Sequence, residues 1–153
     1  MIIGDPFDFA LQFEIVKVWN APDDVWKNGL FSLYISGRRV FGCVDVFELT
    51  TTFGFYHDAP VETLSTNNLV VGKEVLYQNA EDFFMGDGEE LIGGLFDMTC
   101  TAMGDNGVHL YFIKTVSGDR LVWSVDNGIS VSEAMLAPGT VAEVIQELRA
   151  CSL

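Results

Sequence analysis

The chain is poor in basic residues. Its 153 residues include 8 Lys and Arg against 22 Asp and Glu, which gives a formal net charge of −14. Nucleic acids and anionic membrane surfaces would be repelled by this charge, so neither is expected as a partner. The charge suits a basic partner, or serves only solubility. Because 49% of the residues are hydrophobic and only 20% are charged, we expect one folded domain rather than a disordered chain.

Cysteine and histidine are also scarce. The cysteines, Cys43, Cys100 and Cys151, are odd in number, lie far apart and form no CxxC motif. This pattern argues against a disulfide framework and favours a reducing compartment. The histidines, His57 and His109, have no ligand spacing with the cysteines, so the sequence predicts no metal site and no cofactor. We expect His109 to be a partly buried structural residue in a strand.

Long hydrophobic runs and catalytic motifs are missing. No apolar stretch approaches the length of a membrane span, and residues 1–9 lack the basic start and apolar core of a signal peptide. A cytoplasmic protein is therefore expected. The sequence contains no GxSxG, HExxH or P-loop motif, and the stretch from Gly86 to Glu90 has neither the calcium-loop order nor the third glycine of a dinucleotide fingerprint. We predict no catalytic residues and no enzymatic activity.

Alternating hydrophobic residues predict a mostly antiparallel sheet. In residues 7–15 every second side chain is apolar, which is typical of a strand with one buried face. Residues 30–35 and 40–49, separated by Ser-Gly-Arg-Arg, predict a hairpin. The second of these runs is apolar on both faces, so we place it at the centre of the sheet. Further strands are expected at residues 96–103, 108–116, 121–125 and 129–136, while residues 50–55 are β-prone without clear alternation.

The C-terminal segment predicts a helix. Residues 140–143 form a capping box, and an apolar stripe follows at helical spacing: Val141, Val144, Ile145 and Leu148. The sequence therefore predicts a single α+β domain over residues 1–153. Its antiparallel sheet would have about six to eight strands, with the C-terminal α-helix packed on one face.

Residues 74–113 hold eight carboxylates and no Lys or Arg. Within them, Phe83-Phe84-Met85 is either a short buried strand or an apolar anchor surrounded by negative charge, as in an interface hot spot. Glu89 and Glu90 are adjacent and would point apart on a strand, so a solvated loop explains them better than acid–base chemistry. The tryptophans Trp19 and Trp26 are open to both interpretations, core or interface, whereas Trp123 alternates with apolar neighbours and is expected in the core.

The N-terminal third contains three motifs: Met1-Ile2-Ile3-Gly4-Asp5-Pro6, Phe9-Ala10 with Phe13-Glu14, and the run from Gly29 to Gly37. In these motifs the chain shows a resemblance to a family of bacterial immunity proteins, Imm42. The resemblance is looser at residues 121–123 and in the final helix. It implies a cytoplasmic protein that binds and blocks a cognate polymorphic toxin, and it carries no catalytic residues.

We therefore predict neutralisation of a basic toxin by stoichiometric binding. The expected toxin-binding residues lie within the acidic stretch: Asp82, Phe84, Asp87, Glu89 and Glu90. Two other classes of function stay open. A small-ligand-binding or adaptor domain would show a deep apolar pocket, and a hydrolase would place two carboxylates across a cleft.

Overall fold

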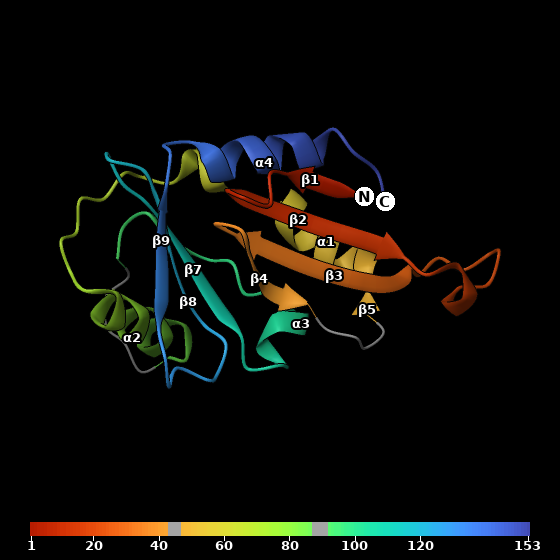
Figure 1. Cartoon of the computed structure of the whole chain (residues 1–153), viewed down its shortest axis with the longest axis horizontal. Helices are drawn as coiled ribbons and strands as arrows, with labels where there is room; N and C mark the ends of the chain where they lie inside the picture. Colours follow the sequence, from red (N-terminus) through yellow and green to blue (C-terminus); the bar gives the residue numbers. More distant parts are fainter. Residues whose placement is uncertain (43–46, 87–91) are drawn as a thin grey trace. The chain divides into compact units, whose positions relative to one another are not determined.

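A computed structural model describes residues 1–42, 47–86 and 92–153 of the chain (Figure 1). The chain forms two compact units. Unit 1 combines residues 1–59 with residues 141–153, and unit 2 is the intervening segment, residues 60–140. Each unit is built on an antiparallel sheet. The predicted α+β class is confirmed, but the strands are divided between two sheets instead of forming one.

The sheet of unit 1 has the order β1-β2-β3-β4, and β5 also pairs with β3. Its strands are β1 (Ile2–Gly4), β2 (Phe9–Ile15), β3 (Asn28–Ile35), β4 (Arg38–Gly42) and β5 (Phe47–Glu48). The predicted buried face of β2 is confirmed at Phe9, Leu11 and Phe13, which are at most 1% exposed. It is wrong at Ile15, which is 39% exposed, and Ala10 on the other face is also buried. The placement of Phe7 in this strand is wrong, because β2 begins at Phe9 and the Phe7 side chain is 80% exposed.

The predicted hairpin is present but its second strand is shorter than expected. Ser36 and Gly37 adopt positive φ between β3 and β4, as a tight two-residue turn requires. The central strand is β3, which pairs with β2, β4 and β5, so the placement of residues 40–49 at the centre is wrong. Residues 43–46 of the expected strand lie outside the described residues. The rest of that run, from residue 47 on, enters β5 and then a helix.

That helix, α1 (Leu49–His57), replaces the β-prone segment expected at residues 50–55. Glu48 starts it by accepting hydrogen bonds from the backbone N–H groups of Thr50 and Thr51. The helix covers the apolar face of the sheet: the ring of Tyr56 lies 5.5 Å from that of Phe31. The three- and four-residue spacing of the buried positions Leu49, Thr52 and Tyr56 therefore outweighs the β propensity of the threonines.

The C-terminal helix, α4 (Thr140–Arg149), has the predicted limits and buries the predicted stripe. It lies beside β1 (Figure 1), where a Glu147 oxygen accepts a hydrogen bond from the Gly4 N–H. At its C-terminal end the Arg149 guanidinium donates to the carbonyls of His57 and Ala59. Residues from both ends of the chain thus complete unit 1.

Unit 2 has a sheet of order β6-β7-β8-β9. The strands are β6 (Leu95–Asp97), β7 (His109–Lys114), β8 (Asp119–Ser124) and β9 (Ser132–Leu136). The last three confirm the predicted meander, and Trp123 is buried as expected. The expected strand at residues 96–103 is wrong beyond Asp97, because the chain turns there into the short helix α3 (Thr101–Gly104).

Helix α2 (Lys73–Phe84) packs on the sheet of unit 2. Leu76, Tyr77 and Ala80 are buried in one cluster with Tyr111 and Val122. The interpretation of Phe83-Phe84-Met85 as a short strand is wrong, since these residues end this helix. Two 3-10 turns, η1 (Lys17–Trp19) and η2 (Val61–Thr63), complete the described elements. None of the helices in the described ranges is both long enough and apolar enough to cross a membrane.

Candidate functional site

The predicted binding residues begin on the last turn of α2. Asp82 accepts a hydrogen bond from the Gln78 amide at 2.7 Å, one helical turn earlier. Phe84 is 40% exposed, and its ring stacks on the ring of Tyr111 with centroids 5.7 Å apart. The other three predicted residues, Asp87, Glu89 and Glu90, lie outside the described part of the chain. The structure therefore brings together one acid and one aromatic ring of the expected surface.

A partly buried polar cluster lies next to Phe84. The Glu81 carboxylate accepts a hydrogen bond of 2.6 Å from the Tyr111 hydroxyl, and the same oxygen lies 2.7 Å from Nδ1 of His109. The side chains of Glu81 and His109 are 19% and 15% exposed. The prediction of a partly buried, structural His109 is confirmed. These contacts join α2 to β7 at the end of the helix that carries Asp82 and Phe84.

Burial sets the protonation of the neighbouring groups. It raises the pKa of the Tyr111 phenol, and the hydrogen bond and negative charge of Glu81 raise it further, so the phenol stays protonated and donates. Burial also raises the pKa of Asp97, although hydrogen bonds from Thr99 act in the opposite direction. The contacts of Glu81 with His109 and Tyr111 hold α2 on the sheet, so the role of this carboxylate is structural.

Metal ligands do not gather in the described residues. Within residues 1–42, 47–86 and 92–153, no group of three or more His, Cys, Asp or Glu side chains is placed to hold a metal ion. Cys100 is buried and Cys151 is partly buried. His57 lies beside Asp58, with its Nδ1 2.7 Å from the carboxylate, on the exposed end of α1.

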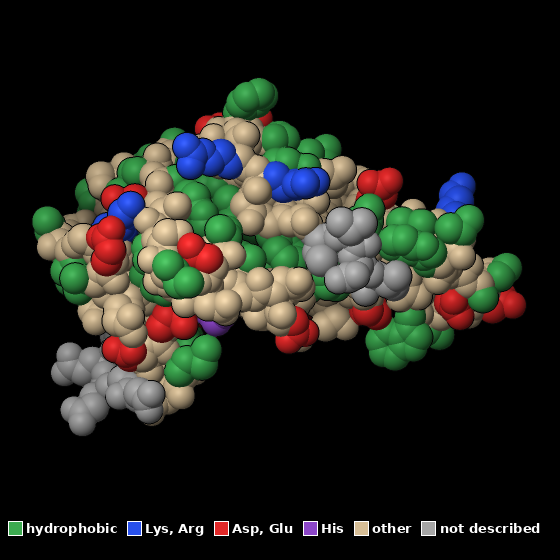
Figure 2. Space-filling view, turned by 60° about the horizontal axis from the view of Figure 1, so that its bottom comes forward, with side chains coloured by type: hydrophobic (Ala, Val, Ile, Leu, Met, Phe, Trp, Pro, Cys, Tyr) green, Lys and Arg blue, Asp and Glu red, His purple; other side chains and the backbone are tan. Residues whose placement is uncertain are grey.

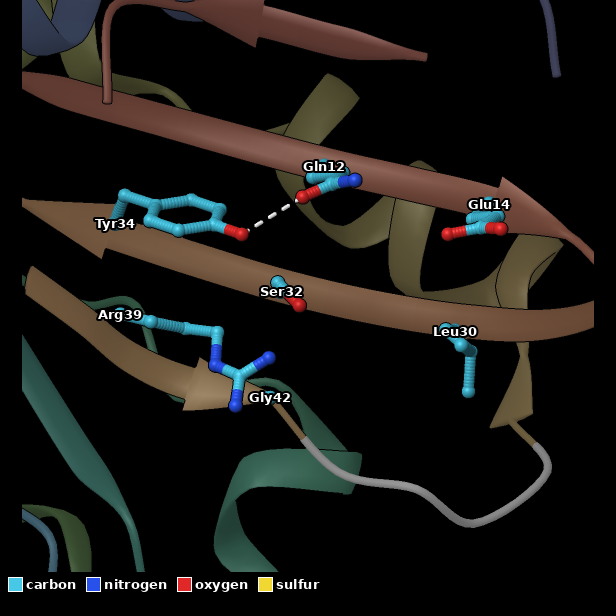
Figure 3. Close-up of a pocket in the computed structure, with 7 residues that line it drawn as sticks. All are labelled: Gln12, Glu14, Leu30, Ser32, Tyr34, Arg39 and Gly42. Atoms are coloured by element: carbon cyan, nitrogen blue, oxygen red, sulfur yellow. Dashed lines mark hydrogen bonds between the residues drawn. The ribbon is translucent and has the colours of Figure 1, made fainter.

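A hollow of about 300 Å³ lies on the face of the unit 1 sheet opposite α1 (Figure 3). Five of its seven lining residues have polar side chains, and the full set is Gln12, Glu14, Leu30, Ser32, Tyr34, Arg39 and Gly42. The Tyr34 hydroxyl donates to the Gln12 side chain at 2.8 Å, so strands β2 and β3 are tied together across the hollow. Pockets for small ligands are mostly apolar. This lining does not match the pocket expected of a small-ligand-binding domain.

The connection between β2 and β3 holds the two tryptophans whose role the sequence left open. Trp26 is 61% exposed and Trp19 is 36% exposed, so neither belongs to the core. Val18 and Val25 on the same connection are exposed even further. Their exposure makes the interpretation of Trp19 and Trp26 as core residues wrong.

The sequence matches the model of Immunity protein 42, Imm42, over residues 1–150. The chain belongs to the Imm42 family. The resemblance seen in the sequence is confirmed, and the match extends over both units. This Imm42 protein is thus an immunity protein, a protein that neutralises a toxin.

A solved structure shares the fold. The crystal structure of CdiI from Burkholderia dolosa AUO158 matches with a TM-score of 0.77 and 16% sequence identity, over 99% of this chain and 100% of that chain. At this identity the likeness shows a common fold alone. None of the curated proteins compared with the Imm42 chain matches its sequence.

Sequence reasoning missed two features of the site. The first is helix α2, whose buried positions Leu76, Tyr77 and Ala80 follow helical spacing, a pattern hidden by its polar and acidic neighbours. The second is the cluster of Glu81, His109 and Tyr111, which joins residues about 30 positions apart. No local pattern indicates such a pairing, because it depends on how the helix docks on the sheet.

Proposed function

We propose that this Imm42 protein neutralises its cognate toxin in the cytoplasm by stoichiometric, non-covalent binding, without catalysis. The family match over residues 1–150 carries this proposal. The partner would be a basic toxin domain, because the chain has a formal net charge of −14 and opposite charges speed the association of two proteins. The same charge disfavours nucleic acid or an anionic membrane as the partner.

The acidic end of α2 is the surface that we propose for capture of the toxin. It includes Asp82 and the partly exposed Phe84, and the acidic stretch continues in the sequence with Asp87, Glu89 and Glu90. The contacts of Glu81 with β7 support this role, because they fix the helix end and so reduce the ordering cost of binding. An aromatic ring with acidic neighbours can contribute both apolar contact and electrostatic attraction.

A titration of toxin activity distinguishes binding from catalysis. Toxin encoded beside the gene for this chain is mixed with increasing amounts of the purified Imm42 protein, and residual toxin activity is measured after several incubation times. Stoichiometric inhibition predicts a linear loss of activity that ends near one equivalent and does not change with time. Inactivation that continues with time at one tenth of an equivalent would show turnover and contradict the proposal.

Isothermal titration calorimetry with a catalytically inactivated toxin gives the second readout. The expected result is a saturable complex with a fixed ratio of the two chains. Inhibition without a complex would contradict the binding mechanism. Absence of both inhibition and binding would contradict the function itself for this toxin.

A further inference from the structure

The connection between β2 and β3 exposes an unusual amount of apolar surface. Residues 16–27, here called the tryptophan loop, include Val18 at 88% exposure, Val25 at 83% and Trp26 at 61%, with Trp19 beside them. Figure 2 shows hydrophobic side chains gathered at the right-hand end of the view, where this loop projects in Figure 1. Single exposed apolar residues are ordinary, but a group of two tryptophans and two valines marks an interaction surface.

Hydrogen bonds hold the tryptophan loop in one conformation. The Asn20 amide donates to the carbonyls of Val16 at 2.8 Å and Asn28 at 2.9 Å, and its oxygen accepts from the Asn28 N–H at 2.6 Å. Asn28 in turn donates to the Trp19 carbonyl. The Asp24 carboxylate accepts from the Ala21 N–H at 2.6 Å. The loop is therefore organised before binding, although its apolar side chains contribute little to the core.

Preorganisation matters for the energetics of an interface. A tryptophan supplies a large rigid contact with only two side-chain torsions, and tryptophan is enriched among the residues that dominate binding. Holding the loop in place removes part of the ordering cost that association otherwise incurs. A loop stabilised by polar contacts at its base, with its apolar side chains outward, has the layout of a binding anchor.

The net charge of the whole chain selects the occupant. The tryptophan loop itself is neutral, because Lys17 and Lys27 balance Asp23 and Asp24, whereas the whole chain carries a net charge of −14. A second copy of this chain would bring the same negative charge, and an anionic lipid surface would be repelled. The complementary occupant is a basic protein surface with an apolar recess.

We infer that the tryptophan loop is the apolar anchor of the toxin interface, with Trp19 and Trp26 inserted into a recess on a basic toxin domain. This inference rests on the proposed toxin-binding function. It adds a second contact surface to the acidic end of α2. The acidic residues there serve mainly the rate of association, whereas the tryptophan loop serves mainly the lifetime of the complex.

The test is a calorimetric titration of the inactivated toxin with the Trp19→Ala/Trp26→Ala double variant of the full chain. We expect binding to weaken by about 100-fold or more, as for the loss of hot-spot residues. The loss of affinity should appear mainly as faster dissociation of the complex, which surface plasmon resonance measures. Thermal unfolding of the variant should match that of the wild type, since the exposed rings carry little of the fold.

A matched pair of variants separates the tryptophan loop from general surface hydrophobicity. Val18→Ser/Val25→Ser removes two exposed valines from the loop. Val70→Ser/Ile129→Ser removes two side chains of 98% and 87% exposure from unit 2. The first variant should weaken toxin binding and the second should leave it unchanged. Equal effects of the two would overturn the inference.

The remaining outcomes distinguish the inference from the function on which it rests. If the wild type neither binds nor inhibits the toxin, the proposed function fails. If the wild type binds and the tryptophan variant binds equally well, only the tryptophan loop is excluded. Sedimentation of the wild type alone, and flotation with phosphatidylcholine and phosphatidylglycerol vesicles, test the other occupants. Self-association or vesicle binding that is lost in the variant would overturn the inference in favour of a second copy or a membrane.

Discussion

The Glu81 carboxylate lies 2.7 Å from Nδ1 of His109, and this contact joins helix α2 to strand β7. The same oxygen accepts the Tyr111 hydroxyl at 2.6 Å. Tyr111 also stacks on Phe84, so one strand holds both the carboxylate and the ring at the end of α2. The acidic surface proposed for toxin capture is therefore supported from beneath by a small network of hydrogen bonds.

Removing the Glu81 side chain should destabilise the fold. Glu81→Ala leaves the partly buried His109 and the Tyr111 hydroxyl without their acceptor, and we expect a loss of about 1–3 kcal/mol in the free energy of unfolding. Asn79→Ala, an exposed position on the same helix, is the control and should change stability by less than about 0.5 kcal/mol. Urea denaturation measures both. In a double-mutant cycle with Tyr111→Phe, fully additive effects would contradict the network.

The apolar face of β2 gives a second stability prediction. Phe9→Ala and Phe13→Ala should each cost about 3–5 kcal/mol, because both rings are at most 1% exposed and their removal leaves cavities. Phe7→Ala is the matched control, since its ring is 80% exposed and its loss should cost little. Urea denaturation of the three variants checks the assignment. Losses below about 1 kcal/mol for both buried positions would contradict it.

The start of α1 should make unit 1 sensitive to acid. Partial burial acts to raise the pKa of the Glu48 carboxyl, but hydrogen bonds from Thr50 and Thr51 outweigh burial and lower this pKa from 4.5 to about 2. A lowered pKa in the folded state means that the stabilising contribution is present above pH 4.5 and is lost as the pH falls toward 2.

Glu48→Ala removes this helix cap and should cost about 1 kcal/mol at pH 7. The difference in unfolding free energy between wild type and variant should shrink as the pH is lowered from 5 to about 2, since protonation weakens the wild-type cap. Urea denaturation at several pH values measures the difference. A difference that stays constant over this range would contradict the role of the ionised carboxylate.

Residue spacing was enough to predict strand β2 and helix α4. The alternation in β2 and the apolar stripe of α4 each record a single buried face, so both were predictable from residue spacing. The helix after Glu48 was not predictable in this way, because three consecutive threonines favour a strand. The decisive feature is the helix cap that the Glu48 side chain supplies. The division into two sheets depends on contacts between distant strands, which periodicity does not record.

The candidate site shows the same limit. The acidic character of residues 74–113 is visible in composition, but the helical form of Lys73–Phe84 decides which acids face the solvent. Glu81 turns toward His109 and Tyr111, whereas Asp82, its neighbour in sequence, bonds only one turn away to Gln78. Adjacent carboxylates thus make different contacts, Glu81 with strand β7 and Asp82 within its own helix.

The last prediction concerns the rate of toxin capture. The variant replaces four acids by their amides: Asp82→Asn, Asp87→Asn, Glu89→Gln and Glu90→Gln. If these residues steer a basic toxin, the association rate should fall about ten-fold or more at low salt. The effect should be much smaller at 1 M salt, where the Debye length is about 3 Å. Phe84 is left unchanged because its ring stacks on Tyr111, so its replacement would also lower the stability of the fold.

A control variant with the same change in net charge separates local steering from total charge. It carries amides at four exposed acids outside residues 74–113: Asp5→Asn, Asp8→Asn, Asp58→Asn and Glu143→Gln. Stopped-flow kinetics at two salt concentrations compares the two variants. A slower rate confined to the first variant supports capture at the end of α2, because only local charge differs. Equal slowing would assign the effect to net charge, and an unchanged rate at low salt would remove this surface from the interface.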